Sequence, residues 1–136
     1  MKKKIQLFSL KKVVSKNGTL IVAQLKKKFD IKRVFAITAD KNALRGSHAH
    51  RYCSQILFCP YGKIEINIFD GKNKKKVYLS KPSQAILIPT MIWSTQKFLI
   101  KNSVLIALCS KKFSEKDYIR DIKIFNKLTK VVKLRN

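Results

Sequence analysis

Short apolar runs recur along the chain, and turn-forming residues separate them. The segment 63–68 reads Lys-Ile-Glu-Ile-Asn-Ile, so its apolar residues alternate strictly with polar ones. Because successive side chains of a strand point to opposite faces, this alternation predicts a strand with one buried and one solvated face. Closely spaced runs of this kind are typical of a β-sandwich or a β-barrel. We expect strands at residues 20–24, 33–38, 55–59, 63–69, 75–79, 85–88 and 103–109.

Turn signals and the end of the chain complete this pattern. The Asp-Gly pair at 70–71 tolerates positive φ and predicts a hairpin turn between two of the strands. Only the last part looks helical, because Ser114 can cap a helix with Asp117 at its N3 position and apolar residues then recur every three to four positions. Tyr118 and Arg120 fall in this helix start, and we interpret them as structural. The expected fold is all-β, a jelly-roll-like β-barrel with one C-terminal α-helix packed on it.

The composition fits one globular domain over residues 1–136. With 46% apolar residues and only four Gly and three Pro, the chain can bury a core without disulfides or metals. No apolar run approaches the roughly 18 residues that cross a bilayer, and the start lacks the apolar core of a signal peptide. The three cysteines, Cys53, Cys59 and Cys109, lie in apolar stretches without C-x-x-C spacing. We therefore expect reduced core cysteines and a cytoplasmic protein with no membrane contact.

The formal net charge of +24 invites comparison with nucleic-acid-binding proteins. Lysine outnumbers arginine 26 to 5, however, although arginine is the better fork for phosphates and base edges. The lysines are scattered over termini, turns and strand ends, and the strands carry few aromatics at a regular spacing that would stack bases. We interpret the charge as a solvated basic surface that favours anionic small substrates, and we expect no nucleic-acid partner.

The chain has two histidines, and both lie in the segment 45–50, which reads Arg-Gly-Ser-His-Ala-His. Positions two apart on a strand share a face, so His48 and His50 should point together into a cavity or into solvent. The plain alternative is a pair of surface or core histidines without a chemical role. A His-x-His pair is also half of a metal site, so a metal centre has to be considered as well.

The residues around this pair resemble the cupin pattern, in which a glycine and His-x-His precede a glutamate, a second glycine and a later histidine. Gly46, the two histidines and Gly62 fit that pattern, but Gln55 stands at the glutamate position and Ser94 at the position of the third histidine. Two imidazoles and a neutral amide form a weak site for a divalent ion. The sequence therefore resembles a cupin without a metal, whose histidines are free for proton transfer.

A longer set of motifs gives a more specific resemblance. The motifs are the Arg-Gly-Ser-His-Ala-His segment at 45–50, Gln55, Gly62, the Asp-Gly pair at 70–71, Pro89, Trp93 and Phe-Ser-Glu-Lys-Asp-Tyr-Ile-Arg at 113–120. Over roughly residues 18–125 the chain is similar to the dTDP-4-keto-6-deoxy-D-glucose 3,4-ketoisomerases. The resemblance implies a cofactor-independent homodimer of cupin barrels that exchange N-terminal strands. It also implies a 3-keto product that an aminotransferase converts to a 3-amino-3,6-dideoxyhexose for a cell-surface glycan such as lipopolysaccharide.

This activity places acid-base chemistry on the two histidines. Moving a carbonyl from C4 to C3 requires removal of the C3 proton, an enediol or enediolate, and delivery of a proton to C4. Imidazole has an ordinary pKa of about 6.5, so it can act as a base and then as an acid near neutral pH. We assign His50 as the base at C3 and His48 as its partner, with the two roles exchangeable.

Four further residues are candidates for substrate binding, and each has a structural alternative. Arg33 and Arg45 would fork to the pyrophosphate, or else form a cationic rim without a ligand. Gln55 would hold a histidine tautomer or a sugar hydroxyl, or else be satisfied by the backbone. Trp93 would wall the sugar or stack on the thymine, or else belong to the core.

Two positions depart from the family pattern. Relatives carry a tyrosine on the strand that holds Phe35 and Ala36 here, and they usually carry a histidine where Ser94 stands. Another hydroxyl, from Tyr52, Ser47 or Ser94, or a water would have to replace that tyrosine. The stereochemistry at C4 stays open, and we favour the galacto over the gluco product.

Other functions fit parts of the same sequence. A dTDP-sugar 3,5-epimerase shares the barrel and a histidine base, but it pairs a single histidine with an aspartate and a distant tyrosine, and no such set is evident here. A non-catalytic basic β-barrel that binds nucleotide or nucleic acid is a second alternative. A metal-dependent cupin oxygenase ranks last, because the sequence lacks the glutamate and the third histidine.

Overall fold

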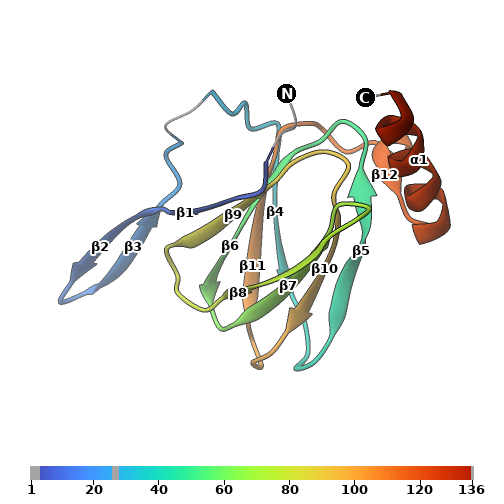
Figure 1. The fold of residues 1–136 in the computed structure, drawn as a ribbon. Coiled ribbons are helices and arrows are strands. Elements are labelled where there is room, and N and C mark those ends of the chain that lie inside the picture. The colour runs from blue at the N-terminus through green and yellow to red at the C-terminus, as the bar shows by residue number, and fades with distance from the viewer. Residues whose placement is uncertain (1–3, 26–27, 136) are drawn as a thin grey trace.

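Two five-stranded antiparallel sheets face each other in the computed structural model, which describes residues 4–25 and 28–135 (Figure 1). The first sheet has the strand order β1-β9-β6-β11-β4, and the second has the order β12-β5-β10-β7-β8. The strands of the first sheet are β1 (Gln6–Ser9), β4 (Arg33–Thr38), β6 (Gln55–Tyr61), β9 (Gln84–Ile88) and β11 (Val104–Cys109). Those of the second are β5 (Leu44–His50), β7 (Ile64–Phe69), β8 (Lys74–Leu79), β10 (Trp93–Phe98) and β12 (Tyr118–Ile119).

The main core lies between the inner faces of the two sheets. Strand β7 shows why: Ile64, Ile66 and Ile68 are buried at 0–3% exposure, whereas Glu65 and Asn67 between them stay partly exposed. Each fully buried side chain of this size contributes about 1.5–3 kcal/mol of transfer free energy. The alternation in the sequence therefore predicts correctly which face of this strand is buried.

The structure confirms the all-β class and each of the seven expected strands to within a few residues. The two sheets remain open at their edges, so the fold is a jelly-roll-like sandwich rather than a closed barrel. Strand β10 was not expected, because two of its buried positions are the polar residues Ser94 and Gln96. Their polarity hides the apolar alternation on which strand recognition depends.

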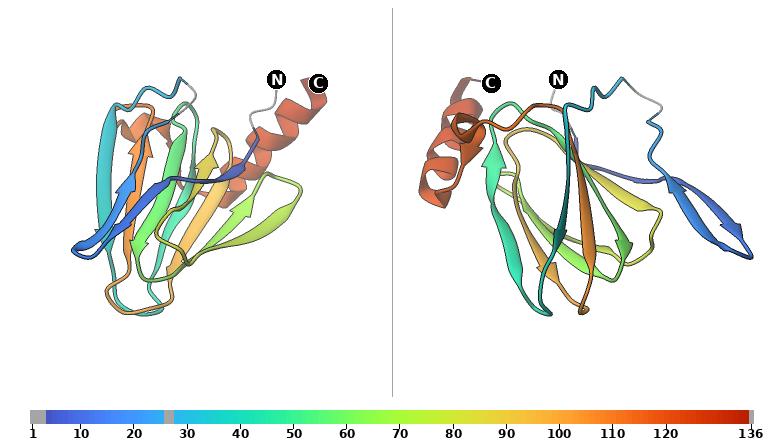
Figure 2. Two further views of the ribbon diagram at one scale, coloured as in Figure 1. Left: turned by 90° about the vertical axis from the view of Figure 1, so that its left-hand side faces the viewer. Right: turned by 180° about the vertical axis from the view of Figure 1, so that it is seen from behind.

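The helix begins later than expected. Helix α1 spans Ile122–Arg135, and the segment before it forms a 3₁₀ turn (Glu115–Asp117) followed by β12. Ser114 makes no side-chain capping bond, and the Asp117 carboxylate binds β5 and the loop after it instead of the helix backbone. Helix α1 lies beside the second sheet (Figure 2). Phe125 packs it onto the outer face of that sheet, where its ring lies 5.7 Å from that of Trp93.

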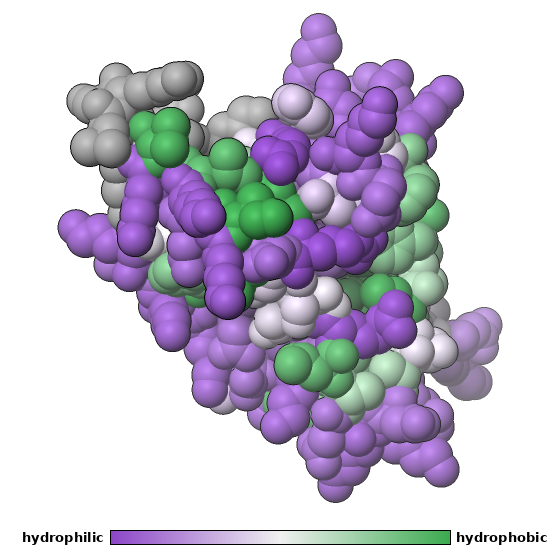
Figure 3. All heavy atoms as spheres, turned by 90° about the vertical axis from the view of Figure 1, so that its right-hand side faces the viewer, coloured by the Kyte–Doolittle hydropathy of each residue, from purple (hydrophilic) through white to green (hydrophobic). Residues whose placement is uncertain are grey.

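The face that carries α1 is mostly hydrophilic, with smaller apolar patches between polar side chains (Figure 3). This agrees with a solvated surface rather than one large apolar patch. Within the described residues, no helix has the length and apolar character needed to span a bilayer.

The hairpin of β2 (Lys11–Ser15) and β3 (Gly18–Val22) projects away from the sandwich (Figures 1 and 2). It forms a separate two-stranded sheet, whereas β1 just before it pairs with β9 of the sandwich. Several apolar side chains of the hairpin are exposed, among them Val13 at 42%, Val14 at 66% and Leu20 at 59%. Apolar side chains left in solvent on a projecting hairpin are typical of a surface that a partner covers.

Candidate active site

A β-bulge in β5 aims the two histidines. In the pairing of β5 with β10, Ser94 lies opposite His48 and Thr95 opposite Gly46, so Ser47 is an extra residue on β5. Gly46 and Ser47 both have positive φ, 81° and 60°. A Cβ at Gly46 would collide with the side chain of Gln96, so both the backbone and the space require glycine there.

Beyond the bulge, His48 and His50 lie on the same inner face of β5, as their spacing predicts. Their ring centroids are 5.0 Å apart and the rings are nearly perpendicular. The ring of Tyr118 completes the cluster, at 4.9 Å from His48 and 4.4 Å from His50. Tyr118 reaches them because β12 pairs with β5, with Tyr118 directly opposite His50.

Asp117 holds the His50 ring in place. Its Oδ2 lies 2.7 Å from His50 Nδ1, and its Oδ1 accepts the backbone N–H groups of Tyr52 at 2.6 Å and Cys53 at 3.3 Å. A carboxylate on Nδ1 selects the tautomer that donates from Nδ1 and leaves a lone pair on Nε2. His50 Nε2 is buried and makes no hydrogen bond with the described residues, so it is the free basic atom of this pair.

Both imidazoles are neutral near pH 7. Burial, reinforced by the neighbouring His50, lowers the pKa of His48 to about 4. Burial also lowers the pKa of His50, and Asp117 opposes only part of that shift. Burial works to raise the pKa of Asp117, but the N–H groups of Tyr52 and Cys53 and the His50 ring hold it below its usual value. The site therefore holds a carboxylate and two neutral imidazoles, which is the charge state that a general base requires.

A cavity of about 330 Å³ opens beside His48 between the two sheets. Three arginines line it, Arg33, Arg45 and Arg120, and among the described lining residues there is no lysine and no acid. This is a strong selection in a chain with 26 lysines and only five arginines. Guanidinium groups fork to phosphates in a way that ammonium groups do not, so the lining suits an anionic ligand with phosphate oxygens.

The structure brings together most of the residues expected at the site. His48, Arg33, Arg45 and Gln55 all line the cavity. His50 is buried directly behind His48 and is not part of the described lining. A ligand in the cavity would therefore contact His48 directly, whereas His50 lies next to His48 and outside the described lining.

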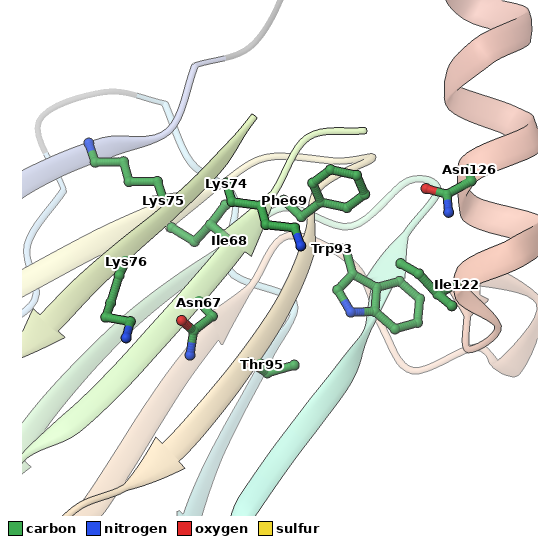
Figure 4. A pocket seen from close by; sticks show the side chains of 10 residues that line it. All are labelled: Asn67, Ile68, Phe69, Lys74, Lys75, Lys76, Trp93, Thr95, Ile122 and Asn126. Carbon is green, nitrogen blue, oxygen red and sulfur yellow. The ribbon is translucent and has the colours of Figure 1, made fainter. Parts of the chain in front are cut away.

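Trp93 is the exception among the expected site residues. It lines a different groove of about 700 Å³ between the outer face of the second sheet and α1, together with Phe69, Lys74 and Ile122 (Figure 4). The cause is the alternation along β10, which buries Ser94 and Gln96 inside and turns Trp93 outward. The expectation that Trp93 walls the sugar is therefore corrected, and its aromatic contact is with Phe125 of α1.

Three functional residues were missed because they seemed to belong to a helix start. Asp117 binds His50, Tyr118 contacts both imidazoles, and Arg120 lines the cavity with its guanidinium 4.2 Å above the Tyr118 ring. They lie about 70 residues from the histidines, so no local pattern connects them. The only signal was the Asp-Tyr-Ile-Arg ending at 117–120, which the family resemblance includes.

Tyr118 also lines the cavity and brings its hydroxyl close to Arg33, on the strand that holds Phe35 and Ala36. Arg33 Nη2 donates to the Tyr118 hydroxyl at 3.4 Å, and Phe35 forms the neighbouring wall. Tyr52, one of the hydroxyls considered from the sequence, is 67% exposed and lies outside the described lining. Ser94 is buried and accepts a hydrogen bond from Gln96.

One group of side chains has the composition of a metal site. His50, Cys53 and Asp117 are all buried, and their ligand atoms lie within 4.8 Å of one another. A hydrogen bond to Cys109 and burial both raise the pKa of Cys53, which disfavours the thiolate that a metal needs. The Asp117 carboxylate already accepts three hydrogen bonds. The donor set thus fits a hydrogen-bonded histidine better than a coordinated cation.

The same geometry contains a histidine, an aspartate and a tyrosine, the set that an epimerase uses and that the sequence did not reveal. Geometry alone therefore does not separate the two sugar-nucleotide activities, and similarity to known proteins does. A Mycobacterium tuberculosis RmlC epimerase aligns at 15% identity with a TM-score of 0.75, over 84% of this chain and 66% of that chain, which shows a shared fold only.

Other relatives are much more similar. The TDP-4-oxo-6-deoxy-alpha-D-glucose-3,4-oxoisomerase of Aneurinibacillus thermoaerophilus is 29% identical over 125 residues, which cover 90% of each chain. QdtA, a sugar 3,4-ketoisomerase of Thermoanaerobacterium thermosaccharolyticum solved with TDP, is 32% identical with a TM-score of 0.88, over 96% of this chain and 97% of that one. WlaRA, a TDP-fucose-3,4-ketoisomerase of Campylobacter jejuni, is 33% identical with a TM-score of 0.84, over 93% and 96%.

The family model described as FdtA: WxcM-like, C-terminal matches residues 3–130. This match and the two ketoisomerase structures above 30% identity each span nearly the whole chain. The chain therefore belongs to the FdtA (WxcM-like, C-terminal) family, together with the sugar 3,4-ketoisomerases that it resembles in sequence and in fold.

Proposed function

We propose that this protein is an isomerase that moves the keto group of dTDP-4-keto-6-deoxy-D-glucose from C4 to C3 without a metal or an organic cofactor. The observation that carries the proposal is the pair of adjacent imidazoles, of which His48 lines a cavity that three arginines also line. The named relatives act on TDP-linked sugars of this kind. A β-sandwich with only a basic surface would not require this buried arrangement.

The proton chemistry follows from the His50–Asp117 pair. One imidazole takes the proton from C3, and the electrons of that bond move through a new C3–C4 double bond onto the C4 oxygen. We assign this step to the free Nε2 of His50, which the substrate would have to reach beside His48, and the two roles stay exchangeable because only His48 belongs to the described cavity lining. A proton delivered to C4 and loss of the proton from the C3 hydroxyl then leave the carbonyl at C3. His48 carries protons between the two oxygens and stabilises the enediolate, a step that the adjacent Tyr118 hydroxyl can share.

The remaining wall binds the substrate. Arg33 and Arg45 fork to the two phosphates, and Gln55 holds a sugar hydroxyl. Support comes from the position of all three side chains on one cavity and from the lack of an acidic residue in its described lining. Arg120 adds a third guanidinium, which Glu115 orients through two bonds of 2.6 and 3.1 Å.

Exchange of substrate hydrogen with deuterated solvent tests this assignment. We expect the wild type to exchange the C3 proton, and His50→Asn to lower that exchange at least about a hundredfold, as removal of a general base does. Exchange that survives in His50→Asn but is lost in His48→Asn would reverse the two roles. Exchange at C5 instead of C3 would assign an epimerase. A wild-type protein that does not bind thymidine diphosphate, but binds a single-stranded oligonucleotide with a steeply salt-dependent affinity, would instead be a nucleic-acid-binding module.

The metal-free mechanism has its own test. Purification without chelators should give no stoichiometric iron, nickel or zinc by elemental analysis, and activity should survive dialysis against EDTA. Stoichiometric metal together with loss of activity on its removal would contradict the mechanism and revive a metal-dependent cupin.

We also propose a homodimer that exchanges N-terminal strands. Support comes from the projecting hairpin of β2 and β3 with its exposed Val13, Val14 and Leu20. Through this exchange the turn at 16–17 would reach the cavity of the second copy. Light scattering should give twice the monomer mass, and Val14→Lys with Leu20→Lys should shift it toward the monomer. A monomeric wild type would contradict the exchange.

The cellular role follows from the product. We propose that the enzyme acts in the cytoplasm, where its three free buried cysteines stay reduced, and that its 3-keto sugar is aminated for a cell-surface glycan such as lipopolysaccharide. We favour the galacto configuration at C4. NMR of the product, trapped as the amine by a 3-aminotransferase, distinguishes it from the gluco isomer.

A further inference from the structure

Cys109 is buried between Arg33 and Gln55, two residues that line the cavity. It is the last residue of β11, where it pairs with Arg33 on β4 on one side and with Gln55 on β6 on the other. Its exposure is 0%, so it does not touch the cavity itself. A side chain in this place can act on the substrate only through its two neighbours.

The Cys109 sulfur accepts hydrogen bonds from both of these neighbours. Gln55 Nε2 donates to Sγ at 3.4 Å, and Arg33 Nη2 donates to Sγ at 3.7 Å. The thiol of Cys53 is a third hydrogen-bond neighbour. The Arg33 guanidinium also lies over the rings of Phe35 and Phe113, each 5.5 Å from its centre. The two rings fix where the guanidinium lies, and the sulfur and the Tyr118 hydroxyl fix which way its donors point.

The donors around the Cys109 sulfur also make its thiol more acidic. The hydrogen bond from Cys53, followed by those from Gln55 and Arg33, lowers the pKa of the Cys109 thiol although burial opposes the shift. A thiol is a weak acceptor, whereas a thiolate is a full counter-ion for a guanidinium. The donors around the sulfur therefore favour the form that holds Arg33 most firmly.

We propose that Cys109 is a positioning residue, whose sulfur holds Arg33 and Gln55 in the orientation that binds the diphosphate and the sugar. This role rests on the proposed function, since it needs a diphosphate for Arg33 to bind. It gives a task to a cysteine that its sequence context makes look like an inert core residue. The cysteine also connects the two halves of the site, because its neighbour Cys53 donates its backbone N–H to Asp117.

Cys59 provides a matched control within the same core. It is equally buried at 1%, and burial raises its pKa to about 11. Its sulfur donates to the backbone oxygen of Tyr61 at 3.1 Å. Neither Cys59 nor Tyr61 belongs to the described cavity lining. Cys59→Ala thus reports the cost of removing a buried sulfur from this sandwich without disturbing Arg33.

Calorimetric titration with thymidine diphosphate tests the proposal. We expect Cys109→Ala to weaken the Kd about tenfold, Cys109→Ser to weaken it less because a hydroxyl still accepts, and Cys59→Ala to leave it unchanged at a similar loss of Tm. In an Arg33→Ala background, Cys109→Ala should weaken binding no further, because its effect passes through that arginine.

Two results would overturn this role. One is a Cys109→Ala protein that binds thymidine diphosphate as tightly as Cys59→Ala. The other is an effect of Cys109→Ala that persists in full in the Arg33→Ala background. A wild type that does not bind thymidine diphosphate at all would instead refute the proposed function, and with it any role in binding for Cys109.

Discussion

Replacing Asp117 with asparagine keeps the shape of the side chain and removes its charge. The wild-type carboxylate receives His50 Nδ1 at 2.7 Å and two backbone N–H groups. Hydrogen bonds to a charged group contribute about 1.5–3 kcal/mol each. If the whole free energy of the hydrogen bond to His50 is lost as transition-state stabilisation, kcat/KM drops roughly 10- to 150-fold, since about 1.4 kcal/mol is a factor of ten. An amide that donates toward Nδ1 would also favour the wrong tautomer.

The pH profile shows whether this loss acts through His50. A base is active when neutral, so kcat/KM falls as pH drops through its pKa. Burial already holds the pKa of His50 below the ordinary 6.5, and Asp117 is the group that raises it. Without that carboxylate the pKa falls further. The acidic limb of the Asp117→Asn profile should therefore lie at lower pH than in the wild type, although the plateau is lower.

Asp30→Asn is the matched control for this experiment. Asp30 is exposed, and among the residues that the structure describes its ion pair is with Lys32 at 2.9 Å on the surface, so its variant should keep the wild-type profile. A drop in rate for Asp117→Asn with an unmoved acidic limb would refute the coupling to His50. A kcat/KM equal to that of the wild type in Asp117→Asn would refute the role of Asp117 altogether.

Three further predictions address the fold around the site. The pKa of His48 falls from 6.5 to about 4 on folding, so the unfolded chain binds more protons in that window and the wild type should lose stability as pH falls from 6.5 to 4. Allowing for partial exposure, the loss is about 2 kcal/mol, and urea unfolding of His48→Gln should show a correspondingly flatter pH dependence. Gly46→Ala should lower Tm and abolish activity, because a Cβ at positive φ collides with Gln96; a fully active variant would contradict the bulge. Trp93→Ala should cost about 2 kcal/mol in urea unfolding through the lost packing on Phe125, and an accompanying loss of thymidine diphosphate affinity would return Trp93 to the cavity.

The sequence predicted the sheets better than it predicted the site. Apolar alternation is a local signal, so strands such as β4 and β7 were found from their own residues. The histidine pair was found for the same reason, because two positions apart on one strand share a face. Asp117 and Tyr118 belong to the site only through the pairing of β12 with β5, which is a tertiary contact. The helix cap expected at Ser114 does not form, because Asp117 makes a stronger hydrogen bond to His50 on the sheet.

Trp93 shows the opposite failure. The sequence shows that it follows Pro89, but its direction depends on which residues of β10 face inward, and two of these are polar. Gln96 and Ser94 satisfy each other by a hydrogen bond of 3.0 Å, which is why they can be buried. Hydrophobicity alone assigns such a strand to the wrong face.

The late position of β12 in the chain has a consequence for the order in which the enzyme matures. When the ribosome has synthesised the residues up to β11, both histidines and nearly all of the two sheets already exist, but the base has no carboxylate behind it and the cavity lacks its third guanidinium. These arrive together within four residues, 117–120, and Phe125 anchors them by closing α1 over Ile119 and Ala49. A chain that ended before this segment would lack Asp117, Tyr118 and Arg120, so we expect it to have no catalytic capacity even if its two sheets form.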